Sequence, residues 1–130
     1  MVGAPAETVR DFVTAFIEAW PSGDATTLAR FFSEDATYHN GPLAPACGRD
    51  AIVAALGSMM QLGGEVDVDI THLVVEGSLV ATERVDYWRS AGQTATLRVA
   101  GICEVHDGVI TAWRDYFDPA EFTSQVADRG

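Results

Sequence analysis

Two stretches of the sequence alternate charged side chains with large aromatic rings. The first contains Arg84, Asp86 and Trp88, and the second contains Trp113, Asp115 and Phe117. Residues two apart on a strand project from the same face, so each stretch places a carboxylate beside an indole. Apolar surroundings perturb the pKa of a carboxylate, which favours a lined pocket with acid–base chemistry. The same spacing also fits charges that face water, and the pattern alone leaves both interpretations open.

The sequence argues against several other kinds of active site, because it lacks lysine and its histidines and cysteines are far apart. All eight basic residues are arginines, and the absence of lysine excludes Schiff-base chemistry, a pyridoxal-phosphate site and a P-loop. His39, His72 and His106 do not have metal-binding spacing, so we do not expect a metal site. Cys47 and Cys103 lack a CxxC spacing and are expected to be reduced thiols, with a single disulfide between them as the alternative.

Composition limits the domain count and the partners. The 130 residues, 48% hydrophobic and 21% charged, are typical of one globular domain, to which we assign residues 1–130. Nineteen acidic residues against eight arginines give a net charge of −11. This surplus argues against nucleic acid and anionic membranes as partners, because both repel a negative chain. We see no signal peptide and no apolar stretch of membrane-spanning length, so we expect a cytoplasmic protein.

The first half of the chain has the pattern of helices. Apolar residues recur at helical spacing over residues 5–20, 24–32 and 49–62, which predicts three helices. Between the second and third, residues 36–39 are predicted as a brief extended segment. Residues 41–48 contain two prolines and two glycines and are predicted as a loop.

The second half changes to the period-two pattern of strands. Strands are predicted over residues 66–74, 79–90, 94–105 and 109–117, followed by a short helix over residues 119–126. Helices followed by an antiparallel meander and a closing helix predict an α+β domain. A curved sheet wrapped on the N-terminal helices would leave an internal pocket on its concave face, the usual place for a small ligand.

Three motifs together resemble the limonene-1,2-epoxide hydrolase family. They are Tyr38-His39-Asn40 with the following Gly-Pro-Leu-Ala-Pro-Ala-Cys-Gly-Arg-Asp-Ala, then Glu83-Arg84-Val85-Asp86, and then Trp113-Arg114-Asp115-Tyr116-Phe117-Asp118. They occur in the family's order with near-family spacing, and the similarity extends over nearly the whole chain. The resemblance implies a cone-shaped, mixed-sheet α+β barrel of the nuclear-transport-factor-2-like (cystatin-like) kind, usually a homodimer without metal or cofactor.

The resemblance also implies roles for individual residues. It assigns the family's Asp-Arg-Asp set to Asp86, Arg84 and Asp115, and its water-holding pair to Tyr38 and Asn40. It implies one-step addition of water to a small apolar epoxide, giving a vicinal diol, with Asp115 as base, Asp86 as acid and Arg84 bridging them. Since free aspartate has a pKa of about 3.9, a proton-holding Asp86 requires an apolar site, a neighbouring carboxylate, or both.

Five residues are expected to form the wall of the substrate pocket: Met59, Trp88, Leu97, Val99 and Trp113. Trp88 is expected to narrow or reshape the space for a substrate. Two other functions fit the same fold. An acid–base pair of this kind also suits an epoxide-opening cyclase or a ketosteroid-isomerase-like proton transfer. A non-catalytic small-ligand-binding domain would not need the two carboxylates to face one cavity.

Overall fold

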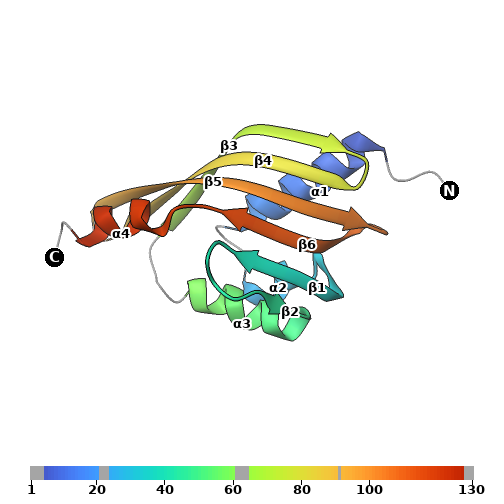
Figure 1. The fold of residues 1–130 in the computed structure, drawn as a ribbon, viewed down its shortest axis with the longest axis horizontal. Coiled ribbons are helices and arrows are strands. Elements are labelled where there is room, and N and C mark those ends of the chain that lie inside the picture. The colour runs from blue at the N-terminus through green and yellow to red at the C-terminus, as the bar shows by residue number, and fades with distance from the viewer. Residues whose placement is uncertain (1–4, 21–23, 61–64, 91, 128–130) are drawn as a thin grey trace.

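A curved β-sheet with helices on its hollow side organises the chain. The computed structural model describes residues 5–20, 24–60, 65–90 and 92–127. The helices are α1 (Ala6–Ala19), α2 (Ala25–Ala29), α3 (Arg49–Met60) and α4 (Pro119–Ala127). The strands are β1 (Phe32–Asn40), β2 (Ala46–Cys47), β3 (Glu65–Glu76), β4 (Leu79–Ser90), β5 (Gln93–His106) and β6 (Val109–Tyr116). Figure 1 shows their arrangement.

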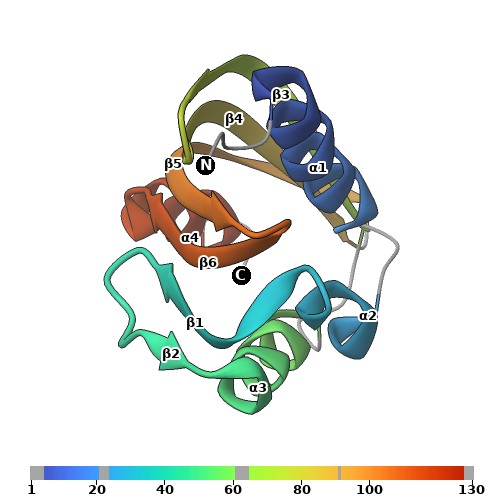
Figure 2. The ribbon, with the colours of Figure 1, turned by 90° about the vertical axis from the view of Figure 1, so that its right-hand side faces the viewer.

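The sheet is mixed and open. Its described strands lie in the order β2-β1-β6-β5-β4-β3, and β1 pairs with β6 in parallel while the other neighbours are antiparallel. Helix α1 lies across the hollow side of β3 and β4, and α2 and α3 lie beside β1 (Figure 2). The predicted α+β architecture is confirmed, although the sheet curves without closing into a barrel.

Two predicted boundaries are wrong around β1. Asp24 caps α2 by accepting a hydrogen bond from the backbone N–H of Thr27 at 2.9 Å, as expected. The helix nevertheless ends at Ala29, because the fully buried Phe32 begins a strand and pairs with Ile110 on β6. A buried aromatic residue suits a strand as well as a helix, so its spacing was ambiguous. The predicted loop over residues 41–48 also contains a short strand, β2, which pairs with β1.

An aromatic cluster fixes α1 against the sheet. Phe16 on α1 is 2% exposed and meets four rings edge-on, the nearest being Trp113 on β6 with centroids 5.0 Å apart. The other three rings belong to Trp20, Phe31 and Phe32. Edge-to-face packing of this kind adds to the burial of apolar area. The helix is thereby held over the concave face, where it covers polar side chains of β4 and β6.

Helix α4 covers part of the edge of β5. Strand β6 pairs with β5 only from Ala100 onward, which leaves the first half of β5 without a strand on that side. The Gln125 side chain accepts from the backbone N–H of Thr96 at 2.9 Å and donates to its carbonyl at 2.7 Å. Glu121 accepts from the backbone N–H of Arg98 at 3.0 Å. These side chains satisfy edge groups that would otherwise be open to another chain.

A glycine in the middle of the sheet provides space for a cross-strand contact. Gly101 on β5 lies between Thr82 on β4 and Asp115 on β6. A Cβ atom at this position would lie 2.6 Å from Oδ1 of Asp115 and 2.7 Å from Nη1 of Arg84. The missing side chain therefore allows Arg84 to reach across β5 to Asp115.

We expect Gly101→Ala to lower the free energy of unfolding by about 1–3 kcal/mol, the usual cost of inserting a methyl group into filled space. Equilibrium unfolding in urea measures the change. Gly57→Ala is the matched control, because a Cβ there would meet only Ala25, at 4.0 Å. That substitution in the interior of α3 should stabilise the protein by about 0.5–1 kcal/mol. Equal effects of the two substitutions would contradict the steric role of Gly101.

Candidate active site

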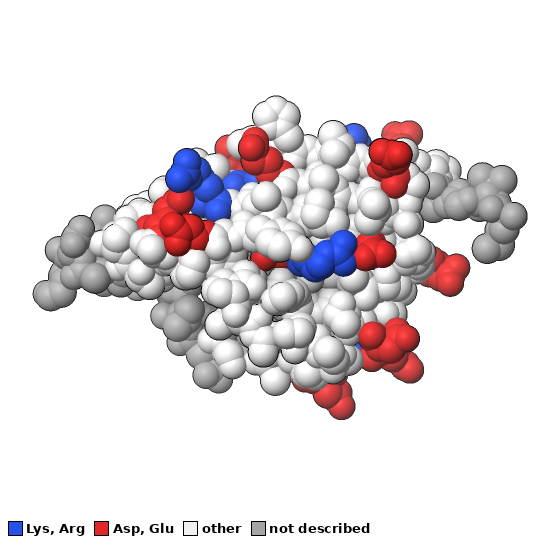
Figure 3. All heavy atoms as spheres, in the orientation of Figure 1, with Lys and Arg blue, Asp and Glu red and all other residues white. Residues whose placement is uncertain are grey.

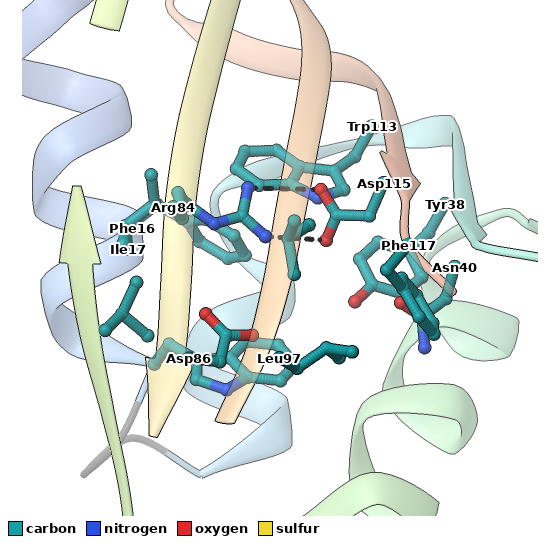
Figure 4. A pocket seen from close by; sticks show the side chains of 13 residues that line it. Phe16, Ile17, Tyr38, Asn40, Arg84, Asp86, Leu97, Trp113, Asp115 and Phe117 are labelled. Atoms are coloured by element: carbon teal, nitrogen blue, oxygen red, sulfur yellow. Dashed lines mark hydrogen bonds and ion pairs between the residues drawn. The ribbon is translucent and has the colours of Figure 1, made fainter. Parts of the chain in front are cut away.

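Three strands present polar side chains to the hollow face of the sheet. Strand β4 carries Arg84 and Asp86, β6 carries Asp115, and β1 carries Tyr38 and Asn40. The register of β1 and β6 places Asn40 beside Asp115. Because the residues of each pair are two apart, their side chains project to the same side of the sheet. Figure 4 shows all five around one cavity, so the structure brings the predicted polar set together.

A buried ion pair lies at the centre of the site. Arg84 donates from Nη1 to Oδ1 of Asp115 at 3.1 Å and from Nη2 to Oδ2 at 3.0 Å. The two side chains are only 6% and 9% exposed. Two parallel hydrogen bonds between a guanidinium and a carboxylate fix both groups in one plane.

The surroundings of Arg84 keep it charged and orient it. Burial by itself would lower the pKa of this guanidinium, but the charge and hydrogen bonds of Asp115 raise the pKa overall. Nη1 also donates to Oγ1 of Thr82 at 3.1 Å, and the guanidinium carbon lies 5.6 Å from the ring centroid of Trp113. A cation over an indole is a further favourable contact.

Arg84 was expected to bridge Asp86 and Asp115, but it binds only Asp115 of the two. Among the described residues, the guanidinium makes hydrogen bonds to Asp115 and Thr82 and none to Asp86. Both terminal nitrogens are already directed at these partners. Arg84 therefore influences Asp86 through its charge rather than through a hydrogen bond.

Asp86 occupies a very different environment from Asp115. Its Oδ1 atom is buried and has no hydrogen-bond partner among the described residues. Burial raises the pKa of Asp86, the charge of Arg84 partly opposes the shift, and the charge of Asp115 adds to it, giving a value of about 6. A carboxyl group with a pKa of about 6 is half protonated near pH 6 and about one-tenth protonated at pH 7.

Tyr38 contributes a neutral hydroxyl group. Burial, and then the negative charge of Asp115, raise the pKa of Tyr38 far above its ordinary value. The hydroxyl therefore keeps its proton and can both donate and accept a hydrogen bond. Asn40 adds an amide to the same side of the cavity (Figure 4). Together they are suited to hold a water molecule near Asp115.

The cavity has a volume of about 110 Å³ and combines this polar set with apolar walls. Of the predicted wall residues, Leu97, Val99 and Trp113 line it. Trp88 shares the face of Asp86 but is not among the lining residues, because its indole packs against Phe122 of α4 with ring centroids 5.6 Å apart. It therefore does not narrow this cavity as expected. The side chain of Met59 is outside the described part of the chain.

Five lining residues were not identified from the sequence: Phe16, Ile17, Trp20, Val68 and Phe117. The first three belong to the apolar stripe of α1, which predicts a buried helix face without showing what that face covers. Phe117 follows Asp115 by two residues, and this spacing was a usable signal for the same face. Nothing in the local sequence distinguishes Val68 from other inward positions of β3.

The described residues offer few other reactive groups near the cavity. No three His, Cys, Asp or Glu side chains among them gather closely enough to hold a metal ion. Cys47 and Cys103 are both free thiols. Burial, followed by the charge of Asp115, raises the pKa of Cys103 to about 12, so this thiol is protonated. None of the described helices has the length and apolar character that crossing a membrane requires.

Comparisons with known proteins match most of the chain. A family model of the SnoaL-like domain matches residues 13–113. Epoxide hydrolase EphG from Mycobacterium tuberculosis is 33% identical over 106 residues, which cover 82% of this chain and 70% of that protein.

Solved structures give the same fold. An LEH-like epoxide hydrolase from M. tuberculosis has a TM-score of 0.79 at 28% identity, and the match covers 95% of this chain and 92% of that one. A protein with a ketosteroid isomerase-like fold from Catenulispora acidiphila has a TM-score of 0.81 at 24% identity, covering 90% and 92% of the two chains. With its nuclear-transport-factor-2-like fold, the chain belongs to the SnoaL-like domain family.

Proposed function

We propose that this protein is an epoxide hydrolase that adds water to an apolar epoxide and releases a vicinal diol without a cofactor. The observation that carries this proposal is the unequal treatment of two carboxyl groups at one cavity. Asp115 is paired with a guanidinium, whereas Asp86 is buried without a hydrogen bond to Oδ1 and has a raised pKa. Such a difference in environment separates a base from an acid. The relatives named as epoxide hydrolases favour the same chemistry.

The proposed step uses water as the nucleophile. Tyr38 and Asn40 hold a water molecule, and Asp115 removes a proton from it as its oxygen bonds to an epoxide carbon. The carbon–oxygen bond at that carbon breaks, and Asp86 gives its proton to the departing oxygen. Arg84 occupies one lone-pair direction on each Asp115 oxygen, and each oxygen retains a second for the water proton.

The step leaves the two carboxyl groups in exchanged protonation states. Asp115 holds the proton that came from water, and Asp86 has become ionised. Proton exchange with solvent restores the starting state before the next turnover. Arg84 stays charged throughout, so it stabilises the negative charge when this charge is on Asp115 and when it is on Asp86.

An isotope experiment tests the reaction. In single-turnover hydrolysis in heavy-oxygen water, we expect the label in the diol and none in the protein. Label in a protein carboxyl group would contradict direct attack by water. A product without solvent oxygen would instead indicate a cyclase or an isomerase built on the same acid–base pair.

We expect Asp115→Asn to lower kcat by about 10²–10⁴-fold, because an amide cannot accept the water proton. Activity on a panel of epoxides measures the loss, and circular dichroism confirms the fold. Asp69→Asn is the matched control, since Asp69 is an exposed carboxylate on β3, outside the cavity. The base assignment is wrong if both variants keep wild-type activity.

The pH profile should report Asp86. Because the proposed acid must be protonated and its pKa is about 6, kcat/KM should fall as pH rises through that value, approaching tenfold per pH unit. The protonated form predominates below this pKa, so this group does not limit activity there. Asp86→Asn should remove the alkaline decline together with most of the activity. A wild-type rate that is constant between pH 5 and pH 8 would exclude Asp86 as the acid.

We also infer that two copies pair through the outer face of the sheet. Three large apolar side chains on the strands are exposed: Val74 at 61%, Leu79 at 46% and Tyr116 at 56%. Leu79 precedes the buried Val80 and Tyr116 follows the buried Asp115, so both point away from the hollow face. Figure 3 shows broad uncharged areas on this face, with one basic cluster and adjoining acidic groups near its middle and further charged groups toward its margins. A second copy would cover this apolar area despite the net charge of −11.

Light scattering after size-exclusion chromatography should give twice the mass of one chain. Tyr116→Arg should shift the mass toward one chain, because it places a charge in the proposed interface. Arg introduced at Leu43, which is equally exposed but lies in the segment after β1, should leave the mass unchanged. A wild-type mass of one chain would contradict the pairing.

A further inference from the structure

A second cavity lies beside the candidate active site. It has a volume of about 220 Å³ and lies between the segment after β1 and helix α3. Besides Tyr38 and Asn40, its lining residues are Leu43, Ala44, Ala46, Ala55 and Ser58. We refer to this space as the side cavity.

The side cavity adjoins the first cavity at its water-holding end. Tyr38 and Asn40 line both spaces, so the two cavities share these residues as a common border. The segment that forms its outer wall is fixed to the site, because the backbone N–H of Gly41 donates to the carbonyl of Asp115 at 2.8 Å. Gly41 has a φ of +59°, and the Phe117 ring occupies the place where a Cβ atom would be. The chain therefore turns away from β1 at a defined angle.

The chemistry of the side cavity suits hydrocarbon. Among the described residues, no charged side chain lines it, and apart from the two shared residues the only polar side chain is the Ser58 hydroxyl. Three of its residues are alanines, whose small side chains leave the space open. Leu43, at 58% exposure, marks the rim toward solvent.

The first cavity is small for a complete apolar substrate. Its volume of about 110 Å³ is below the roughly 150 Å³ of an apolar cavity that accommodates benzene. It has room for the epoxide ring and a few carbon atoms next to Asp86 and Asp115. A larger substituent has to extend elsewhere, and the side cavity is an apolar space that shares two lining residues with the first cavity.

We propose that the side cavity binds an apolar arm of the substrate, so that the preferred substrates are epoxides with an extended hydrocarbon substituent. This inference rests on the proposed function and adds the substrate class to it. The ring would lie between the two carboxyl groups, and the arm would pass Tyr38 and Asn40 toward Leu43.

A chain-length series tests the proposal. For terminal 1,2-epoxyalkanes from butane to dodecane, kcat/KM of the wild-type protein should rise by about fourfold per methylene until the arm reaches the rim, because each buried methylene contributes a constant free energy. Ala55→Leu should end the rise at a shorter chain and lower kcat/KM for the longest substrate by at least tenfold relative to the shortest.

The matched control is Ala54→Leu. Ala54 precedes Ala55 on α3 but is exposed and does not line the side cavity, so its variant should keep the wild-type chain-length profile. Ala44→Leu provides an independent test in the exposed segment after β1, where the fold does not depend on helix packing. The proposal is overturned if a folded Ala55→Leu or Ala44→Leu variant has the same dependence of kcat/KM on chain length as the wild type.

Binding of 1,2-alkanediols, measured by calorimetry, separates this proposal from the proposed function. The wild-type Kd should decrease with chain length, and Ala55→Leu should flatten the trend. If no epoxide is turned over but this diol trend and its loss are found, the hydrolase proposal fails and the side cavity keeps its role. If epoxides are hydrolysed but neither the kcat/KM trend nor the Kd trend changes in Ala55→Leu or Ala44→Leu, the hydrolase proposal stands and the role of the side cavity is wrong.

Discussion

The buried pair between Arg84 and Asp115 is the interaction on which the site depends. Removing two opposite charges from water is costly, and it is tolerated only where the geometry of the pair is good and the remaining polar groups are satisfied. Here the two hydrogen bonds are parallel, and Thr82 accepts a third from the guanidinium. The absent side chain of Gly101 gives the arginine its path across β5. The pair therefore requires that β4, β5 and β6 are aligned so that Arg84, Gly101 and Asp115 lie next to one another.

The same pair creates the asymmetry on which the proposed chemistry depends. Because its terminal nitrogens are directed at Asp115 and Thr82, Arg84 gives Asp86 a nearby charge but no hydrogen bond. Burial then dominates at Asp86 and raises its pKa. One guanidinium thus leaves two carboxyl groups of the same residue type in different hydrogen-bonding environments. The aromatic packing of α1 around Phe16 helps to bury the concave face on which both carboxyl groups lie.

The sequence predicted the polar set because strand geometry fixes which side chains share a face. The spacing of Arg84 and Asp86, and the motif around Asp115, were sufficient for that. It did not predict which hydrogen bonds Arg84 makes, since these depend on the space at Gly101 and on the register of three strands. Trp88 was predicted to line the pocket because the strand pattern shows which face it lies on. That pattern does not show the position of α4, where Phe122 packs against the indole. The side cavity depends on how α3 packs, which no local pattern encodes.

The burial of Cys103 has a consequence for an enzyme of this kind. Its thiol lies close enough to the site for the charges of Asp115 and Arg84 to act on it. Epoxides are alkylating agents, and a thiolate is the form of cysteine that attacks such electrophiles. With a pKa of about 12, Cys103 supplies almost no thiolate, and the chain has no lysine amine to compete with water. The proposed epoxide hydrolase would in this way be protected from covalent self-inactivation at its own core.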